Sequence, residues 1–267
     1  MDKQKVEELL SSLFSKDKKE KLLNDMKIPA KIIGMGQTGV GKTELLKSIF
    51  RISDSDKEVI AKLKTGSTES VTKDFFSFQI TSKEGFCVQF TDGPGLGESD
   101  DLEEHYISMW INEIPKHDLL YWVLDGSSRD ISHIQKNMKR ILDATNYRDK
   151  IVVVLNKVDQ ILISSEDEIK GLIGWNTDFN EPSKILLELI EKRTDDIIKK
   201  LITHVDITRE QIVVCSARKR WNHEQVLDKF LKYLPDNVRI KASVNREIKD
   251  FTELMSDEAK KKLGKKL

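Results

Sequence analysis

The sequence predicts an α/β fold in which helices cover both faces of a mixed, mostly parallel six-stranded sheet. From residue 30 onward, short apolar segments of strand length alternate with longer segments that suit helices, which is the pattern of βα units. One connection is different, because the polar residues 82–85 between two strand-like segments allow only an antiparallel hairpin. We therefore expect one antiparallel edge strand on a parallel core.

The expected elements follow one another along the chain. Apolar strand segments lie at 30–35, 74–81, 86–91, 119–124, 151–155 and 211–215. Helices are expected to fill 42–51, 98–114, 130–146, 183–204 and 222–233. Residues 2–26 have apolar residues at helical spacing, and a last helix is expected at about 241–262. The predicted division is an N-terminal helical extension at 1–27, a central domain at 28–236 and a C-terminal helix with a basic tail at 237–267.

Composition narrows the class of protein. The 267 residues are 38% hydrophobic, and 45 basic residues balance 45 acidic ones, which suits one globular domain with helical extensions and gives no clear nucleic-acid or membrane signal. The lysines near the C-terminus are interpreted as a solvated helix end. Cys87 and Cys215 are far apart and are expected to be buried in a reducing compartment. Without a signal peptide or a bilayer-length apolar run, we expect a cytoplasmic protein.

A phosphate-binding motif follows the first strand. Residues 36–43 read Gly-Gln-Thr-Gly-Val-Gly-Lys-Thr, which matches GxxxxGK(S/T) between a strand and a helix. The glycines let backbone N–H groups approach phosphates, Lys42 would reach the β- and γ-phosphates, and the Thr43 hydroxyl would bind Mg²⁺. The predicted phosphate-binding residues are Gly36, Gln37, Thr38, Gly39, Val40, Gly41, Lys42, Thr43 and Glu44.

A second motif, Asn156-Lys157-Val158-Asp159, indicates which base is bound. The Asp159 carboxylate would accept hydrogen bonds from guanine N1–H and the N2 amine, whereas adenine offers neither donor, so GTP and GDP are favoured over adenine nucleotides. The stem of Lys157 is expected to lie along the base, and Asn156 is expected to tie its loop to residues 36–43. After the last strand, Ser216 and Ala217 would place the Ala217 N–H near guanine O6.

Two further segments are candidates for the γ-phosphate and the metal. Asp92-Gly93-Pro94-Gly95 follows the third strand, where Asp92 could hold Mg²⁺ through a water and the Gly95 N–H could contact the γ-phosphate. Residues 52–73 are polar and without periodicity, which predicts a long functional loop. Within it, Thr72 is the preferred ligand of Mg²⁺ and the γ-phosphate, and Thr68 is the alternative.

In this order, GQTGVGKT, SVT, DGPG, NKVD and CSA resemble the five G-motifs of Ras-like GTPases over roughly residues 30–235. The resemblance implies a P-loop NTPase G domain that binds GTP and GDP with Mg²⁺ and hydrolyses GTP. DGPGLGE is similar to the Era-like, septin-like and immunity-associated branches. The segment from Gly174 to Ser183 resembles a bacterial Era-like subfamily of poorly defined role.

Two departures from that family matter. Leu96 stands where Ras-type enzymes carry a water-orienting glutamine, which implies slow intrinsic hydrolysis that needs catalytic help. Gly39 replaces the asparagine of potassium-activated relatives, so potassium stimulation is not expected. Help could come from a nucleotide-dependent homodimer, with Arg129 the preferred catalytic residue over Arg51 and His133, or from a separate effector protein. A switch, a GTP-driven assembly protein at a membrane and a nucleotide-gated binding module remain open.

Overall fold

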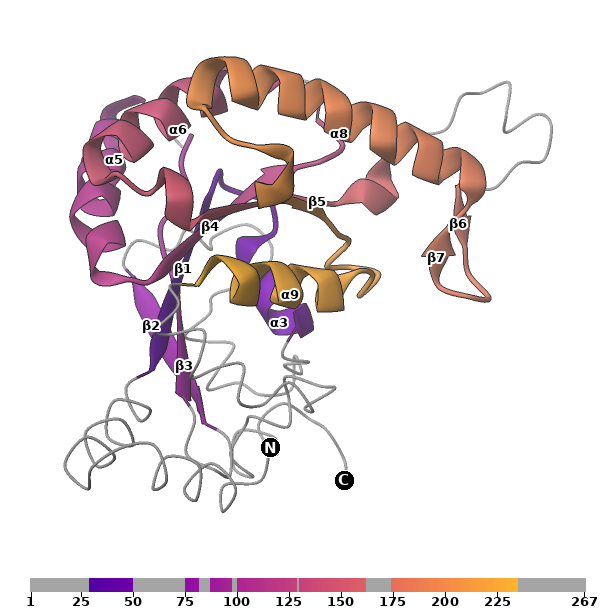
Figure 1. Ribbon diagram of the computed structural model, residues 1–267, viewed down its shortest axis with the longest axis horizontal. Helices are drawn as coiled ribbons and strands as arrows, with labels where there is room; N and C mark the ends of the chain where they lie inside the picture. The colour runs from indigo at the N-terminus through magenta and orange to yellow at the C-terminus, as the bar shows by residue number, and fades with distance from the viewer. Residues whose placement is uncertain are drawn as a thin grey trace, which may run out of the picture.

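The chain forms a six-stranded sheet with the order β2-β3-β1-β4-β5-β8 (Figure 1). The computed structural model describes residues 29–49, 75–81, 87–97, 100–128, 130–161 and 174–234. All neighbouring strands pair in parallel except β2 and β3, which are antiparallel. The strands are β1 (Ala30–Gly36), β2 (Phe76–Thr81), β3 (Cys87–Asp92), β4 (Leu119–Asp125), β5 (Ile151–Asn156) and β8 (Ile212–Val214).

Helices cover both faces of the sheet (Figure 1). One apolar core joins the strands to α3 and α9, and a second joins their other face to α5, α6 and α8. The α-helices are α3 (Lys42–Ile49), α5 (Asp100–Glu113), α6 (Ser132–Thr145), α8 (Lys184–Val205) and α9 (His223–Tyr233). Short 3₁₀ helices are η1 (Ile114–Lys116), η2 (Arg148–Lys150), η3 (Val158–Gln160) and η4 (Arg209–Gln211).

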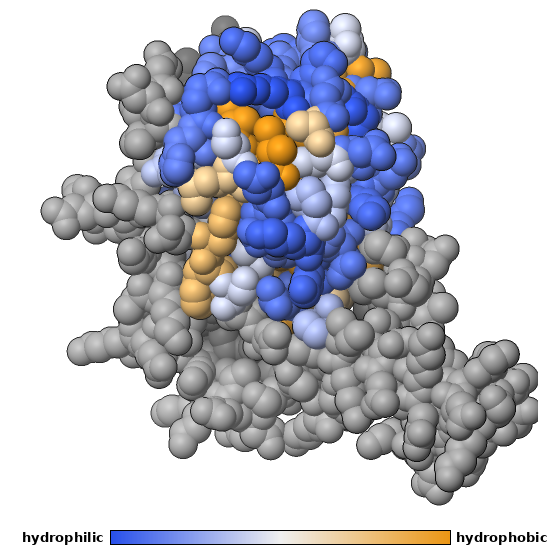
Figure 2. Space-filling model, turned by 90° about the vertical axis from the view of Figure 1, so that its left-hand side faces the viewer, coloured by the Kyte–Doolittle hydropathy of each residue, from blue (hydrophilic) through white to orange (hydrophobic). Residues whose placement is uncertain are grey.

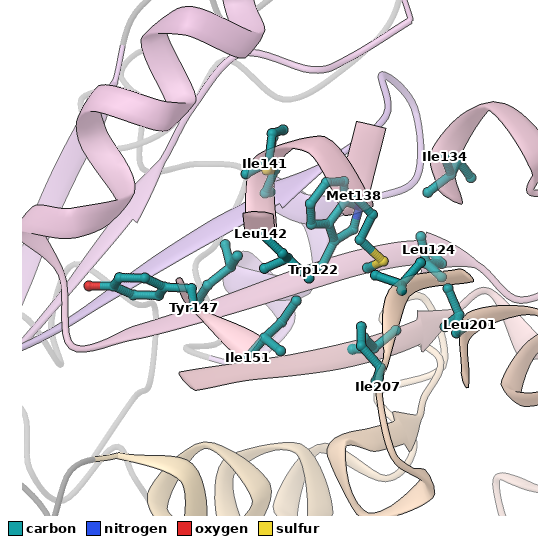
Figure 3. Close-up of a cluster of buried hydrophobic side chains, with 14 of the residues drawn as sticks. Trp122, Leu124, Ile134, Met138, Ile141, Leu142, Tyr147, Ile151, Leu201 and Ile207 are labelled. Carbon is teal, nitrogen blue, oxygen red and sulfur yellow. The ribbon is translucent and has the colours of Figure 1, made fainter. Parts of the chain in front are cut away.

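The central strands are buried on both faces, which explains their continuous apolar sequences. Every residue of β5 is buried, and so are the first six of β4. Figure 3 shows how Trp122 and Leu124 of β4 meet Met138 of α6 and Leu201 of α8 in the second core. The face seen in Figure 2 is mostly hydrophilic where the structure describes it, with a small group of apolar residues among the polar ones.

The predicted α/β class, the mixed sheet and its antiparallel edge strand are confirmed. The strand and helix positions agree with the expected ranges to within a few residues. A two-stranded hairpin was not predicted: β6 (Trp175–Asn176) pairs antiparallel with β7 (Glu181–Pro182). Strands of two residues are too short to show a period of alternation, so the sequence pattern contains no signal for them.

Several expectations lie outside the described residues. They are the helices at 2–26 and 241–262, the loop at 52–73 and the turn at 82–85. Among the helices that the structure describes, none combines the length and apolar character that crossing a bilayer requires.

Candidate functional site

The predicted motifs meet at one edge of the sheet, where the parallel strands have their carboxyl ends. Register pairs Gly36 with Val123 between β1 and β4, and Asp125 with Asn156 between β4 and β5. The connection after β1 leads to β2 on one side of it, and the connection after its neighbour β3 leads through α5 to β4 on the other side. Ligands of open α/β sheets bind where the connections of adjacent strands diverge in this way. The segments beginning at residues 36, 92, 125, 156 and 215 therefore surround one position.

The loop between β1 and α3 has the backbone shape that phosphate binding needs. Gly39 and Gly41 have φ of +80° and +89°, a region that favours glycine. A Cβ on Gly41 would lie 2.6 Å from Asn156 Nδ2. Because α3 begins at Lys42, its first N–H groups have no acceptor within the helix and its positive end faces this loop. Lys42 is 8% exposed, and its Nζ lies 3.4 Å from the carbonyl oxygens of Gly36 and Gln37.

The segment after β3 is bound to this loop through the backbone. Thr38 N–H donates to Leu96 O at 3.0 Å, and Leu96 N–H donates to Gly36 O at 3.1 Å. The approach is so close that a Cβ on Gly95 would lie 2.2 Å from Thr38 Oγ1. The Leu96 side chain is 2% exposed and belongs to the second apolar core. It is therefore packed into the protein and offers no polar group to a water molecule.

Asp92 and Thr43 form a polar pair at the start of that segment. Thr43 Oγ1 donates to Asp92 Oδ2 at 2.5 Å, and Asp92 is 1% exposed. Burial raises the pKa of Asp92, while the charge of Lys42 and the hydrogen bonds from Thr43 and Gly93 oppose that rise. A hydroxyl and a carboxylate are oxygen ligands of the kind that Mg²⁺ prefers, so these residues fit the predicted metal.

Asn156 connects three segments of the site. Its side chain is buried, with Nδ2 donating to Val40 O at 3.0 Å and Oδ1 accepting from Ala217 N–H at 2.9 Å. The expected tie between its loop and residues 36–43 is confirmed. The Ala217 N–H, expected near guanine O6, faces the Asn156 oxygen in this structure, so its contact with the base stays a prediction.

The motif predicted to read the base, residues 156–159, has partners that the sequence had not suggested. Lys157 has a left-handed backbone with φ of 62°, and its Nζ lies 3.0 Å from Asp125 Oδ2. Burial alone would raise the pKa of Asp125, but hydrogen bonds from Ser127 and Lys157 outweigh it and the net pKa is lowered. Ser216 Oγ donates to Asp159 Oδ1 at 2.6 Å. Asp125 could have been suspected, because a carboxylate that ends a buried strand lies at the ligand edge of a parallel sheet.

Five candidate residues are not placed at the site by the described part of the structure. Thr72 and Arg129, together with the alternatives Thr68 and Arg51, lie outside the described residues. His133 lies on α6, where its Nε2 is 3.5 Å from Glu103 Oε2.

Comparison with known proteins places this geometry in context. Residues 31–157, slightly less than half of the chain, match the family model described as 50S ribosome-binding GTPase. The tRNA modification GTPase MnmE of Thermotoga sp. (strain RQ2) is 26% identical over 211 residues, which are 78% of this chain and 43% of the relative. The uncharacterized protein YfjP of Escherichia coli (strain K12) is 24% identical over 207 residues, which are 76% of this chain and 62% of the relative.

The chain thus spans between about two fifths and three fifths of the length of these two relatives. Among solved structures, the bacterial dynamin GTPase LeoA from ETEC superposes with a TM-score of 0.53 at 17% identity, covering 90% of this chain and 43% of that chain. At this identity the likeness concerns the fold. Taken with the motifs and the sheet edge on which they meet, the comparisons lead to one conclusion: the chain carries a GTP-binding P-loop GTPase domain.

Proposed function

We propose that this protein is a nucleotide-controlled switch that hydrolyses GTP slowly with Mg²⁺. The observation that carries the proposal is Leu96, which follows Gly95 next to the phosphate loop but has its side chain packed in the core. A group that orients the attacking water contributes substantially to GTP hydrolysis, and a buried leucine cannot supply it. Slow turnover in the isolated protein follows, as does a need for a residue from elsewhere.

Mg²⁺, bound by Thr43 and Asp92 with Thr72 completing the set, would neutralise charge that develops on the phosphates. Thr43 Oγ1 and Asp92 Oδ2 lie 2.5 Å apart. Lys42, directly beside Thr43 at the start of α3, adds a fixed positive charge in a buried position. Asp92, Thr43 and Lys42 together suit a triphosphate bound to Mg²⁺ better than they suit a free triphosphate or a free cation.

A second copy of the chain is the first candidate for catalytic help, with Arg129 reaching the phosphates of its partner. Residues 128 and 130 flank Arg129 just beyond β4, whose carboxyl end belongs to the site. A guanidinium that arrives in this way stabilises charge in the transition state. The alternative source of catalytic help is a separate activating protein, and the alternative function is a GTP-driven assembly.

The test is GTP turnover per protomer across a hundredfold range of protein concentration at saturating GTP and Mg²⁺. A rate that rises with concentration supports completion of the site by pairing. A flat, slow rate directs the search to an activating partner, and turnover near zero at every concentration indicates a nucleotide-gated binding module instead.

Arg129→Ala separates the catalytic role of Arg129 from nucleotide binding. We expect turnover at high protein concentration to fall by about tenfold or more, with GTP affinity unchanged. Arg209→Ala is the control, because Arg209 is an exposed arginine at the amino end of β8, opposite the site. Unchanged turnover in Arg129→Ala would remove that residue from the proposal.

Asp159→Asn tests the identity of the base. An amide in place of the carboxylate can accept only one of the two hydrogen bonds from guanine, so the preference for GDP over ADP should shrink by roughly tenfold or more. Competition binding against a fluorescent GDP analogue measures the preference. Equal binding of ADP and GDP by the unmodified protein would contradict the role of Asp159.

A further inference from the structure

The unpredicted β6–β7 hairpin is bonded to the turn that carries Ser216. Asn180 Nδ2, at the end of the hairpin turn, donates to Lys219 O at 2.8 Å. Trp175 Nε1 donates to Asn180 Oδ1 at 3.4 Å, and Lys219 Nζ lies 5.6 Å from the centre of the Trp175 ring. Figure 1 shows the hairpin at the amino end of α8. Residues from one short hairpin therefore hold the middle of the 216–221 turn.

A small apolar cluster joins the same hairpin to both base-reading loops. Its buried members are Val158, Leu186 and Ile190, and Trp175 and Trp221 pack against them. The two tryptophan rings meet edge to face, with centroids 6.0 Å apart and planes at 84°. Val158 lies between Lys157 and Asp159 in the sequence, so this cluster anchors the loop that reads the base as well as the 216–221 turn.

A short series of bonds then leads to the carboxylate. Trp221 and Ser216 exchange two backbone hydrogen bonds, of 3.2 and 3.0 Å. Ser216 Oγ donates to Asp159 Oδ1 at 2.6 Å. The direction in which Asp159 presents its carboxylate thus depends on the 216–221 turn, and that turn is held by the hairpin.

We propose that the β6–β7 hairpin is a positioning element for guanine recognition, in which Asn180 and Trp175 hold the turn that orients Asp159. This inference rests on the proposed role of Asp159. Its consequence is that the hairpin sets both the release rate of GDP and the discrimination between GDP and IDP. IDP lacks the N2 amine, so it engages only one of the two hydrogen bonds that an aligned Asp159 makes with guanine.

The experiment compares three variants of the full chain. Asn180→Gly removes the bonds of the side chain at a residue with φ of +52°, where glycine is unstrained. Trp175→Ala removes the ring from the apolar cluster. Phe179→Ala is the matched control, because Phe179 lies in the same hairpin turn but is 75% exposed. Release of a fluorescent GDP analogue and competition by GDP and IDP are measured for each, with thermal melting as a check of folding.

We expect Asn180→Gly to release GDP about five to ten times faster, which corresponds to about 1–1.4 kcal/mol, and Trp175→Ala at least as fast. The dissociation constant of IDP divided by that of GDP should be smaller in Asn180→Gly and Trp175→Ala than in the unmodified protein. Phe179→Ala should behave as the unmodified protein does. Unchanged release of GDP by Asn180→Gly and Trp175→Ala would overturn the role of the hairpin but not the proposed function of the protein. Equal weakening of GDP and IDP would also overturn it, because general loosening does not select the N2 amine. Failure of the unmodified protein to prefer GDP over IDP would overturn it together with the role of Asp159.

Discussion

Replacement of Asn156 by alanine should destabilise the protein even without nucleotide. The substitution removes the bond from Nδ2 to Val40 O and the bond from Ala217 N–H to Oδ1, both of them buried. A buried polar group left without a partner costs about 1–3 kcal/mol, so two such groups set a range of about 2–6 kcal/mol. Because water can partly fill the vacated space, we expect a loss of about 2–4 kcal/mol in the free energy of unfolding.

Urea unfolding in nucleotide-free buffer measures this loss directly. The midpoint should fall with the slope unchanged, and the melting temperature should drop by roughly 4–16 °C for a domain of this size. Gln160→Ala is the control, because Gln160 is exposed near the same loop and should change the free energy by less than about 0.5 kcal/mol. A value for Asn156→Ala as small as that of the control would refute the idea that Asn156 ties the three segments together.

Two further predictions concern Gly95, beside the phosphate loop, and His117, near the amino end of β4. Gly95→Ala would place a Cβ 2.2 Å from Thr38 Oγ1 and 2.9 Å from the Thr38 backbone N, so the loop must shift. We expect the affinity for GTP, measured by calorimetric titration, to fall about tenfold and the affinity for GDP to fall less. An equal fall for both nucleotides would contradict a contact between the Gly95 N–H and the γ-phosphate. Burial lowers the pKa of His117, whose Nε2 lies 2.8 Å from Thr91 Oγ1. Folding therefore favours the neutral form of His117. The contribution of this effect to the free energy of unfolding is fully present above about pH 6.5, the pKa in the unfolded chain, and is lost as the pH falls through the lower pKa of the folded protein. As the pH is lowered from 7.5 to 5, the midpoint of urea unfolding should fall less in His117→Gln than in the unmodified protein. Parallel pH profiles of the two proteins would exclude His117 as the cause of the loss of stability.

The elements of the sheet were predictable because their signals are local. The buried runs of β4 and β5 are apolar over consecutive residues, and α8 shows Leu186, Ile190, Ile197 and Leu201 along one buried stripe. The phosphate loop is equally local, since its glycines, Lys42 and Thr43 lie within one strand–turn–helix unit. The β6–β7 hairpin left no such signal, because its two-residue strands are held by Asn180 and Trp175 against residues far along the chain.

Sequence alone thus determined the α/β class, the edge strand and the position of the phosphate-loop motif, and it predicted which motif reads the base. Tertiary structure decided which of these segments hold one another. Asn156 bonds to Val40 across 116 positions and to Ala217 across 61, and Thr43 meets Asp92 across 49. The burial of Leu96 was also decided by tertiary structure, as were the contacts of Lys157 with Asp125 and of Asp159 with Ser216. Such contacts depend on the order β3-β1-β4-β5-β8 in the sheet, and strand order is set by packing between distant segments, for which no local period of residues carries a signal.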